Sequence, residues 1–202
     1  MAGMSRHGAR RGPNSPFVLD VSELGRKPGS MVTLQETVPS PARIGVELLA
    51  IAKGAPITLD LRLESVSDGV LVSGTASAPT EGECARCLTP VTDHVDIDLA
   101  EFFAYPDSEI EAEAEEDEVG HVVYDAAGDT VDIEQQIIDA VGLALPFSPL
   151  CREDCPGLCP ECGVQLASAE PGHHHDVIDP RWAKLAAIIP TEEEEPTAGG
   201  SE

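Results

Sequence analysis

The sequence predicts an α+β fold, with an antiparallel or barrel-like β-sheet in the N-terminal half, one main helix, and a C-terminal module built around cysteines. Three observations support this prediction. Residues 57–64 alternate between apolar and polar with the period of a half-buried strand, residues 131–145 carry apolar residues at helical spacing, and six cysteines fall into two short-gapped groups. Only one Trp, two Tyr and four Phe are available for a core in 202 residues, so we expect a bound metal to add stability.

Residues 16–105 form the predicted β-rich domain. Strands are expected over residues 17–21 and 32–38, whereas residues 43–53 fit a strand or a short helix equally well. The alternating strand 57–64 is followed by Asp68-Gly69, a tight-turn dipeptide, and then by alternation over 70–76, which predicts a hairpin. A further strand is expected over residues 91–103. The Cys84-Ala-Arg-Cys87 pair therefore falls in the connection between two antiparallel strands.

An acidic loop over residues 106–120 is expected to divide the chain, because residues 107–118 hold eight acidic side chains and no Lys or Arg. The segment 121–150 then contains the main helix, predicted over 131–145. Its apolar residues are Ile133, Ile137, Val141 and Leu145, its cap candidates are Asp129-Thr130 and Asp132, and Pro146 ends it. A second, short helix is expected over residues 180–189, around Trp182 and Leu185.

Both termini are predicted to be disordered, as a basic arm over residues 1–15 and an acidic tail over residues 190–202. The N-terminus lacks the apolar stretch of a secretory signal, and no apolar run approaches the ~20 residues of a membrane helix. We therefore expect a cytoplasmic protein. In that reducing compartment, clustered cysteines favour metal binding over disulfides.

The net charge of −25 disfavours unassisted binding to a phosphate backbone and favours basic partners. The acidic stretches 107–118 and 192–195 have two interpretations: solvated faces that confer solubility, or elements that attract a basic partner protein.

Cys159-Pro-Glu-Cys162-Gly163 has the form of a zinc knuckle, in which the glycine permits a positive φ so that peptide N–H groups can point at the thiolates. Zinc takes four thiolate or imidazole ligands, and His173 and His175 would complete a Cys₂His₂ site. These two are preferred over His174 because alternate side chains of an extended segment point to one side. The competing interpretation is a solvated histidine run with no ligand role.

Cys84, Cys87, Cys151 and Cys155 would form a second site, of the Cys₄ type, which joins the β-sheet to the predicted C-terminal zinc-binding module over residues 151–189. Such a site carries a net charge of about −2, and Arg86 and Arg152, each next to a ligand, are placed to offset it. The rival arrangement is one zinc site made of the 84/87 and 159/162 pairs. We favour two zinc ions over one.

A catalytic role is not predicted. Thioredoxin-like chemistry at Cys84 and Cys87 needs a helix N-terminus in a βαβ unit, and the expected flanks are antiparallel strands. A hydrolytic zinc site keeps an open coordination position, whereas these ligands group as four and four.

The chain resembles the YceD family, the large ribosomal RNA subunit accumulation proteins, in an actinobacterial form. The resemblance spans roughly residues 17 to 188 and rests on four features. They are Cys84-Ala-Arg-Cys87-Leu88 between strands, the acidic loop, the helix ending in Leu145-Pro146, and the run from Cys151 through Gly157-Leu158-Cys159 to Cys162-Gly163. Some relatives keep only the first cysteine pair. Others carry Cys-x-Cys in place of His173-x-His175, which supports a ligand role for the two histidines.

The resemblance implies a ribosome biogenesis factor that promotes accumulation of large-subunit rRNA. With the charge balance, it predicts contact with a basic ribosomal protein or a pre-rRNA particle, and neither a membrane nor a small-molecule substrate. The alternative is a thiol-based redox protein that uses Cys84 and Cys87.

Overall fold

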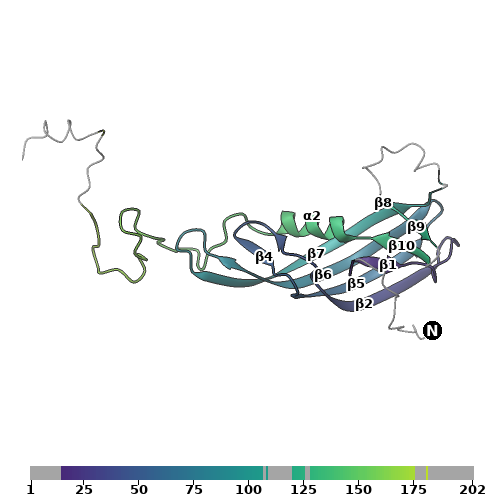
Figure 1. The fold of residues 1–202 in the computed structure, drawn as a ribbon, viewed down its shortest axis with the longest axis horizontal. Helices are drawn as coiled ribbons and strands as arrows, with labels where there is room; N and C mark the ends of the chain where they lie inside the picture. The colour runs from purple at the N-terminus through teal and green to yellow at the C-terminus, as the bar shows by residue number, and fades with distance from the viewer. Residues whose placement is uncertain (1–14, 107, 109–119, 126–127, 176–180, 182–202) are drawn as a thin grey trace, which may run out of the picture. The chain divides into compact units, whose positions relative to one another are not determined.

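The computed structural model describes residues 15–106, 108, 120–125, 128–175 and 181. The chain divides into two compact units, Met1–Gly157 and Leu158–Glu202. All strands and the one helix of the described residues lie in the first unit (Figure 1). Four predicted segments lie wholly or mostly outside the described residues: the basic arm, the acidic loop, the short helix at 180–189 and the acidic tail.

The first unit is built on a seven-stranded sheet with the order β2-β5-β6-β4-β3, in which β7 also pairs with β6, and β8 with β7. Every neighbouring pair is antiparallel except β7 and β8. The strands are β2 (Met31–Pro39), β3 (Ile44–Gly45), β4 (Leu49–Ile51), β5 (Pro56–Ser65), β6 (Gly69–Glu83), β7 (Pro90–Ala104) and β8 (Gly120–His121).

The predicted hairpin is confirmed, since β5 pairs with β6 around Asp68-Gly69, and residues 43–53 form two short strands rather than a helix. A second, three-stranded antiparallel sheet follows the order β1-β10-β9. Its strands are β1 (Val18–Asp20), β9 (Val123–Asp125) and β10 (Gly128–Asp132). The α+β class is therefore confirmed.

Helix α2 (Glu134–Ala144) begins later than predicted. Residues 131 and 132 belong to β10, so the expected start over residues 129–132 is wrong: Val131 pairs with Leu19 instead. Ile133 is the N-cap residue and makes no side-chain cap bond. The Asp132 carboxylate accepts a hydrogen bond from the Glu134 backbone N–H at 2.9 Å, so it serves the first turn from within the strand. The predicted end before Pro146 is confirmed.

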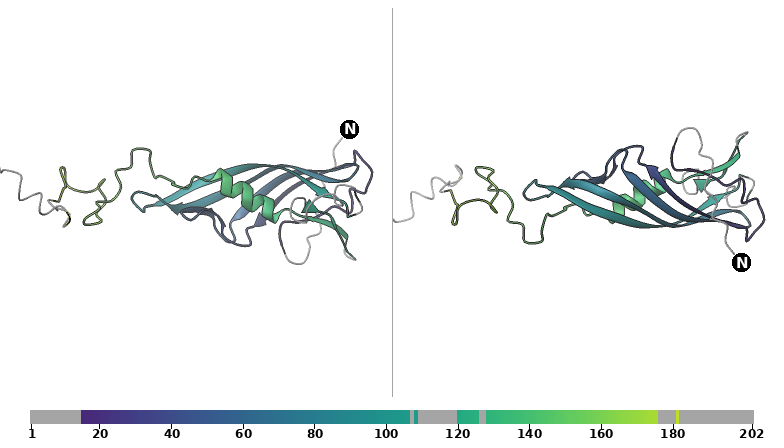
Figure 2. Two further views of the ribbon diagram at one scale, coloured as in Figure 1. Left: turned by 90° about the horizontal axis from the view of Figure 1, so that it is seen from above. Right: turned by 90° about the horizontal axis from the view of Figure 1, so that it is seen from below.

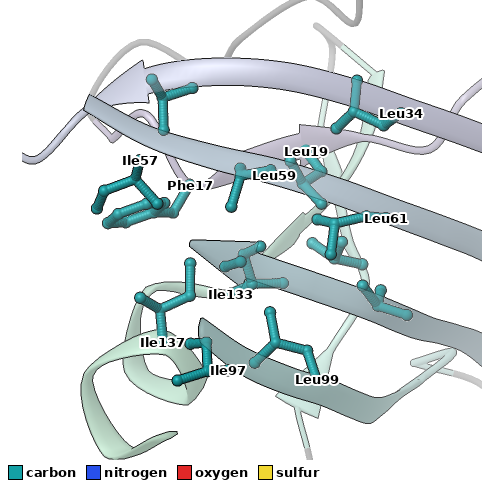
Figure 3. Packing of buried hydrophobic residues seen from close by; sticks show 14 of the residues in the cluster. Phe17, Leu19, Leu34, Ile57, Leu59, Leu61, Ile97, Leu99, Ile133 and Ile137 are labelled. Atoms are coloured by element: carbon teal, nitrogen blue, oxygen red, sulfur yellow. The ribbon is translucent and has the colours of Figure 1, made fainter. Parts of the chain in front are cut away.

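The core lies between the large sheet and α2. On β5, the alternating residues Ile57, Leu59 and Leu61 are buried, whereas the residues between them are exposed. The buried side of α2 presents Ile137 and Val141 to the sheet. Figure 3 shows Ile137 beside Ile97. In opposite views the helix lies in front of the strands and then behind them, so α2 covers one face of the sheet (Figure 2).

This core is almost entirely aliphatic, with Phe17 and Phe103 as its large, fully buried aromatic residues. Within the described residues, no helix has the length and apolar character needed to cross a membrane.

Candidate metal centres

The first centre is assembled at the end of the long β6–β7 hairpin. Cys84 and Cys87 lie in the connection between these strands, and Cys151 and Cys155 come from the segment after α2. Two hydrogen bonds hold the segments together: the Ala85 N–H donates to the carbonyl of Pro149 at 2.8 Å, and the Arg86 guanidinium donates to the carbonyl of Cys155 at 3.0 Å.

The four sulfur atoms of this centre have the spacing of a tetrahedral metal site. The Sγ atoms of Cys84 and Cys155 are 3.8 Å apart, and those of Cys87 and Cys151 are 3.6 Å apart. With metal–sulfur bonds of about 2.3 Å, tetrahedral geometry places sulfur atoms about 3.8 Å from one another. All four ligand atoms lie within 4.8 Å of each other. Four convergent thiols that form no disulfide are a donor set suited to a soft or borderline cation.

The environment of these thiols differs from one to the next. Burial raises the pKa of Cys84, but hydrogen bonds from the backbone N–H groups of Cys151, Arg86 and Cys87 outweigh it and lower the pKa to about 6. Burial raises the pKa of Cys155 to about 12, although the Gly157 N–H opposes this effect. The backbone therefore stabilises a thiolate at Cys84, whereas at Cys155 a metal ion must displace a proton.

Thr89 is a contributor that the sequence analysis missed. Its hydroxyl lies 3.0 Å from the Sγ of Cys87, and this hydrogen bond is the main cause that lowers the pKa of that thiol. Its carbonyl accepts a hydrogen bond from the Cys84 N–H at 2.9 Å. A threonine two residues after a cysteine carries no recognisable signal, because the contact exists only once the turn has formed.

Gly157 is a second contributor without a predicted role. Its φ is 81°, and a Cβ atom there would lie 3.2 Å from the carbonyl oxygen of Arg86, so glycine permits both the turn and the close approach. The Arg86 guanidinium is fixed on the ligand segment, whereas Arg152 forms an exposed ion pair with Asp154 at 3.3 Å. Of the two arginines expected to offset thiolate charge, Arg86 is the one bonded across the centre.

The second centre lies within Leu158–Glu202 and is built from local contacts. The Sγ of Cys162 is 3.4 Å from the Nε2 of His173, and the Nε2 atoms of His173 and His175 are 3.1 Å apart. Together with Cys159 these ligand atoms lie within 4.8 Å of one another. The Nδ1 atom of His174 lies 2.8 Å from the Gly172 carbonyl instead, and His174 is not part of the group.

Both cysteine pairs adopt the same knuckle. The N–H of the residue after the second cysteine donates to the carbonyl of the first at 2.9 Å, from Leu88 to Cys84 and from Gly163 to Cys159. That residue has a positive φ in both cases, 58° at Leu88 and 72° at Gly163. Backbone N–H groups of residues 161 and 162 lower the pKa of Cys159, as expected for a loop folded around a thiolate.

The structure thus gathers the eight predicted ligand residues into two groups of four, each contained in one unit. Within the described residues, the 84/87 pair is completed by 151/155, and the 159/162 pair by His173 and His175. No third group of comparable ligands occurs among these residues. Both groups are compatible with metal binding.

Comparison with known protein families gives a match over the part of the chain that holds both centres. The model of the family described as large ribosomal RNA subunit accumulation protein YceD matches residues 72–189, from β6 through both centres. The chain belongs to the YceD family. Membership implies a role in the accumulation of ribosomal RNA and a link to the large ribosomal subunit.

The curated relatives are mycobacterial. An uncharacterized protein of Mycobacterium tuberculosis is 62% identical over 186 residues, which cover 91% of this chain and 87% of the relative. An uncharacterized protein of Mycobacterium leprae is 59% identical over 175 residues, which cover 87% of this chain and 78% of the relative. No solved structure matches the chain.

Proposed function

We propose that the protein is a cytoplasmic, non-enzymatic ribosome biogenesis factor that binds two zinc ions and promotes accumulation of large-subunit rRNA. The observation that carries the proposal is the grouping of eight thiol and imidazole ligands as four and four, with the ligand atoms of each group within 4.8 Å of one another. Four protein ligands leave no open coordination position, which is typical of structural zinc rather than catalytic zinc.

Cys84, Cys87, Cys151 and Cys155 would hold the first ion, and Cys159, Cys162, His173 and His175 the second. Metal content tests this assignment directly. We expect two zinc ions per chain by native mass spectrometry, one in Cys84→Ser and one in Cys159→Ser. A wild-type content of one ion that both substitutions abolish would replace it with the single-site arrangement.

The partner is expected to be a basic ribosomal protein or a pre-rRNA particle of the large subunit. A chain with a net charge of −25 repels phosphate but attracts Lys- and Arg-rich protein. Cells that lack the protein should accumulate less large-subunit rRNA, and the protein should co-sediment with large-subunit precursors at low salt. Normal levels of both rRNAs in a deletion strain would contradict the proposal.

A thiol-redox function is the second candidate, and the pKa of about 6 at Cys84 is the observation that favours it. However, the Cys84 side chain is completely buried, and a bulky disulfide substrate needs access to the attacking sulfur. Alkylation of Cys84 in the zinc-loaded protein at the rate of a free thiol would favour the redox function.

A further inference from the structure

Large apolar side chains are exposed on and beside α2. The exposed fraction is 88% for Leu143, 80% for Phe147, 54% for Leu88 and 37% for Ile138. Ile138 is five residues from Leu143 and therefore about 140° away around the helix axis, on another face, so we call Leu143, Phe147 and Leu88 the apolar surface. Leu88 belongs to the first knuckle, which the bond from Ala85 to Pro149 joins to the segment that follows α2. Residues 140–150 contain no charged side chain, although 24% of the chain is charged.

Packing within the described residues does not explain this surface. The helix already buries one complete stripe against the sheet: Ile133, Ile137, Val141 and Leu145 are each at most 6% exposed. The outer face of such a helix is ordinarily polar. Gln135 and Asp139 fit this rule, because the Gln135 side-chain amide donates a hydrogen bond to the Asp139 carboxylate at 2.9 Å. Large apolar side chains left exposed near one another, as Leu143 and Phe147 are in sequence, commonly mark an interaction site on a soluble protein.

Leu88 supports the same conclusion independently. Its φ of 58° is a left-handed conformation that a leucine adopts only under steric strain and a glycine adopts freely. The equivalent residue of the second knuckle is Gly163. A leucine in a strained conformation, with more than half of its side chain exposed, gains nothing from burial in the described structure. Its side chain is therefore available to a partner.

Charge indicates what that partner carries. The last turn of α2 has no basic side chain to offset the partial negative charge of its terminal carbonyl groups. Asp139 is exposed on the same helix, and the net charge of the chain is −25. Two basic side chains lie near the apolar surface in sequence, but Arg86 donates to the Cys155 carbonyl and Arg152 pairs with Asp154. A second copy of the chain or an RNA would therefore meet net repulsion here, whereas a segment with apolar side chains flanked by Lys and Arg would meet net attraction.

We infer that the apolar surface binds an apolar, Lys- and Arg-rich segment of a basic protein of the large-subunit precursor. This inference rests on the proposed function and adds the site at which the partner binds. Leu143 and Phe147 are its anchors, because they expose the most apolar surface and removing that surface from water favours binding roughly in proportion to its area.

A defined peptide tests the inference on the zinc-loaded, full-length protein. The probe is a fluorescently labelled 14-residue amphipathic helix of leucine and lysine, and its control is an oligolysine of equal charge. We expect the Leu143→Ser/Phe147→Ser double variant to bind the amphipathic peptide at least tenfold more weakly than wild type, and oligolysine with unchanged affinity. The matched control is Met31→Ser/Val32→Ser, which removes exposed apolar side chains from β2 and should leave both affinities unchanged. Equal affinity of all three proteins for the amphipathic peptide would overturn the inference.

A photo-reactive amino acid in place of Phe147 tests it in cells. The expected product is a cross-link to a basic large-subunit protein that is lost when Leu143→Ser is added. A cross-link to RNA, to a second copy or within the chain would overturn the inference, as would the absence of any cross-link.

The rRNA phenotype separates this inference from the proposed function. If deletion lowers large-subunit rRNA and the double variant fails to restore it, both are supported. If the double variant restores it fully, the surface assignment fails and the proposed function stands. If deletion leaves rRNA normal, the proposed function itself fails.

Discussion

The two centres use the same knuckle in opposite structural settings. In the first, the sulfur atoms of Cys84 and Cys155 meet across 71 positions of sequence, and three of the four cysteines are buried. In the second, all ligands fall between residues 159 and 175, and only Cys159 is buried. The first centre is attached to an aliphatic core, whereas the described residues around the second contribute no strand or helix.

This difference shows that an identical local motif can depend on metal to different degrees. The β6–β7 hairpin positions Cys84 and Cys87 whether or not an ion binds, because its register is fixed over fifteen residue pairs from Gly69↔Ala104 to Glu83↔Pro90. Residues 158–175 have few other interactions that could hold their fold without a metal ion, because their backbone hydrogen bonds are confined to short turns and an isolated bridge between Leu158 and Gln165. Metal should therefore decide the fold of the second unit and only the local order of the first.

Metal removal should have the largest effect, and it should fall on the second unit. Structural zinc contributes on the order of 10 kcal/mol or more in small modules. We expect a chelator, or Cys159→Ser, to abolish amide exchange protection at residue 159 and at Gly163, whose N–H groups are hydrogen-bonded within this segment, while the β5–β6 hairpin keeps its protection. Hydrogen exchange followed by mass spectrometry measures both regions in one experiment. Equal protection of residues 158–175 with and without metal would show that the second unit does not depend on metal for its fold more than the first unit does.

Cys155→Ser should have the next largest effect, confined to the first unit. We expect the loss of one metal ion and a destabilisation of about 4 kcal/mol or more, in the range associated with a lost metal ligand. Exchange protection should fall over residues 146–157, because the knuckle no longer holds that segment. Residues 158–175 should be unaffected, since their four ligands are complete without it. Loss of both metal ions from this variant would reveal a shared site.

The same contrast explains how much of the structure could be predicted from sequence. Period-two alternation in Ile57, Leu59 and Leu61 specified β5 and its buried face, because one side of that strand contacts the core. Short gaps between ligands marked both knuckles. The start of α2 was misplaced because Val131 is apolar at helical spacing yet pairs with Leu19 of β1, a contact between residues far apart in sequence.

Contacts that depend on tertiary structure could not be predicted in the same way. The Thr89 hydroxyl on Cys87, the Gly157 turn against Arg86 and the strained Leu88 follow from how the segments meet, not from residue type at a spacing. The exposed apolar surface was also missed, since Leu143 and Phe147 are indistinguishable by type from core residues. Only the position of Leu143 relative to the buried stripe of α2 shows that it faces outward.

Thr89→Val should produce a moderate effect at the first centre alone. The variant keeps the volume of the side chain but removes the hydroxyl that lowers the pKa of Cys87. Loss of such a supporting contact typically weakens metal binding by about 10- to 100-fold. Without it the pKa of Cys87 rises, so protons compete with the metal at higher pH. The midpoint pH of metal release from the first centre should therefore shift upward, and release from the second should not change. A chelator titration followed across pH measures both, and an unchanged midpoint would mean that the contact with Thr89 does not support metal binding.

The smallest expected effects come from exchanging the residues that follow each knuckle. Gly163 has a φ of 72° and open space around the position of a Cβ atom, so Gly163→Leu should cost the left-handed backbone penalty of about 1–2 kcal/mol, less the roughly 0.5–1 kcal/mol by which glycine favours the unfolded chain. Leu88→Gly should relieve the same backbone penalty at the first knuckle. Glycine favours the unfolded chain by roughly 0.5–1 kcal/mol, which offsets part of this gain. The free energy of unfolding of the first unit should therefore stay equal or rise slightly.

The two substitutions thus have opposite predicted signs although they occupy equivalent positions. Denaturant unfolding of the zinc-loaded Leu88→Gly variant measures the stability of the first unit. Metal retention by the second centre measures the effect of Gly163→Leu. If Leu88→Gly instead destabilised the first unit by more than about 1 kcal/mol, the leucine side chain would have to make packing contacts that its 54% exposure does not indicate. A neutral or stabilising result would mean that folding does not require a leucine at this position, as expected if the exposed side chain serves a contact outside the folded chain.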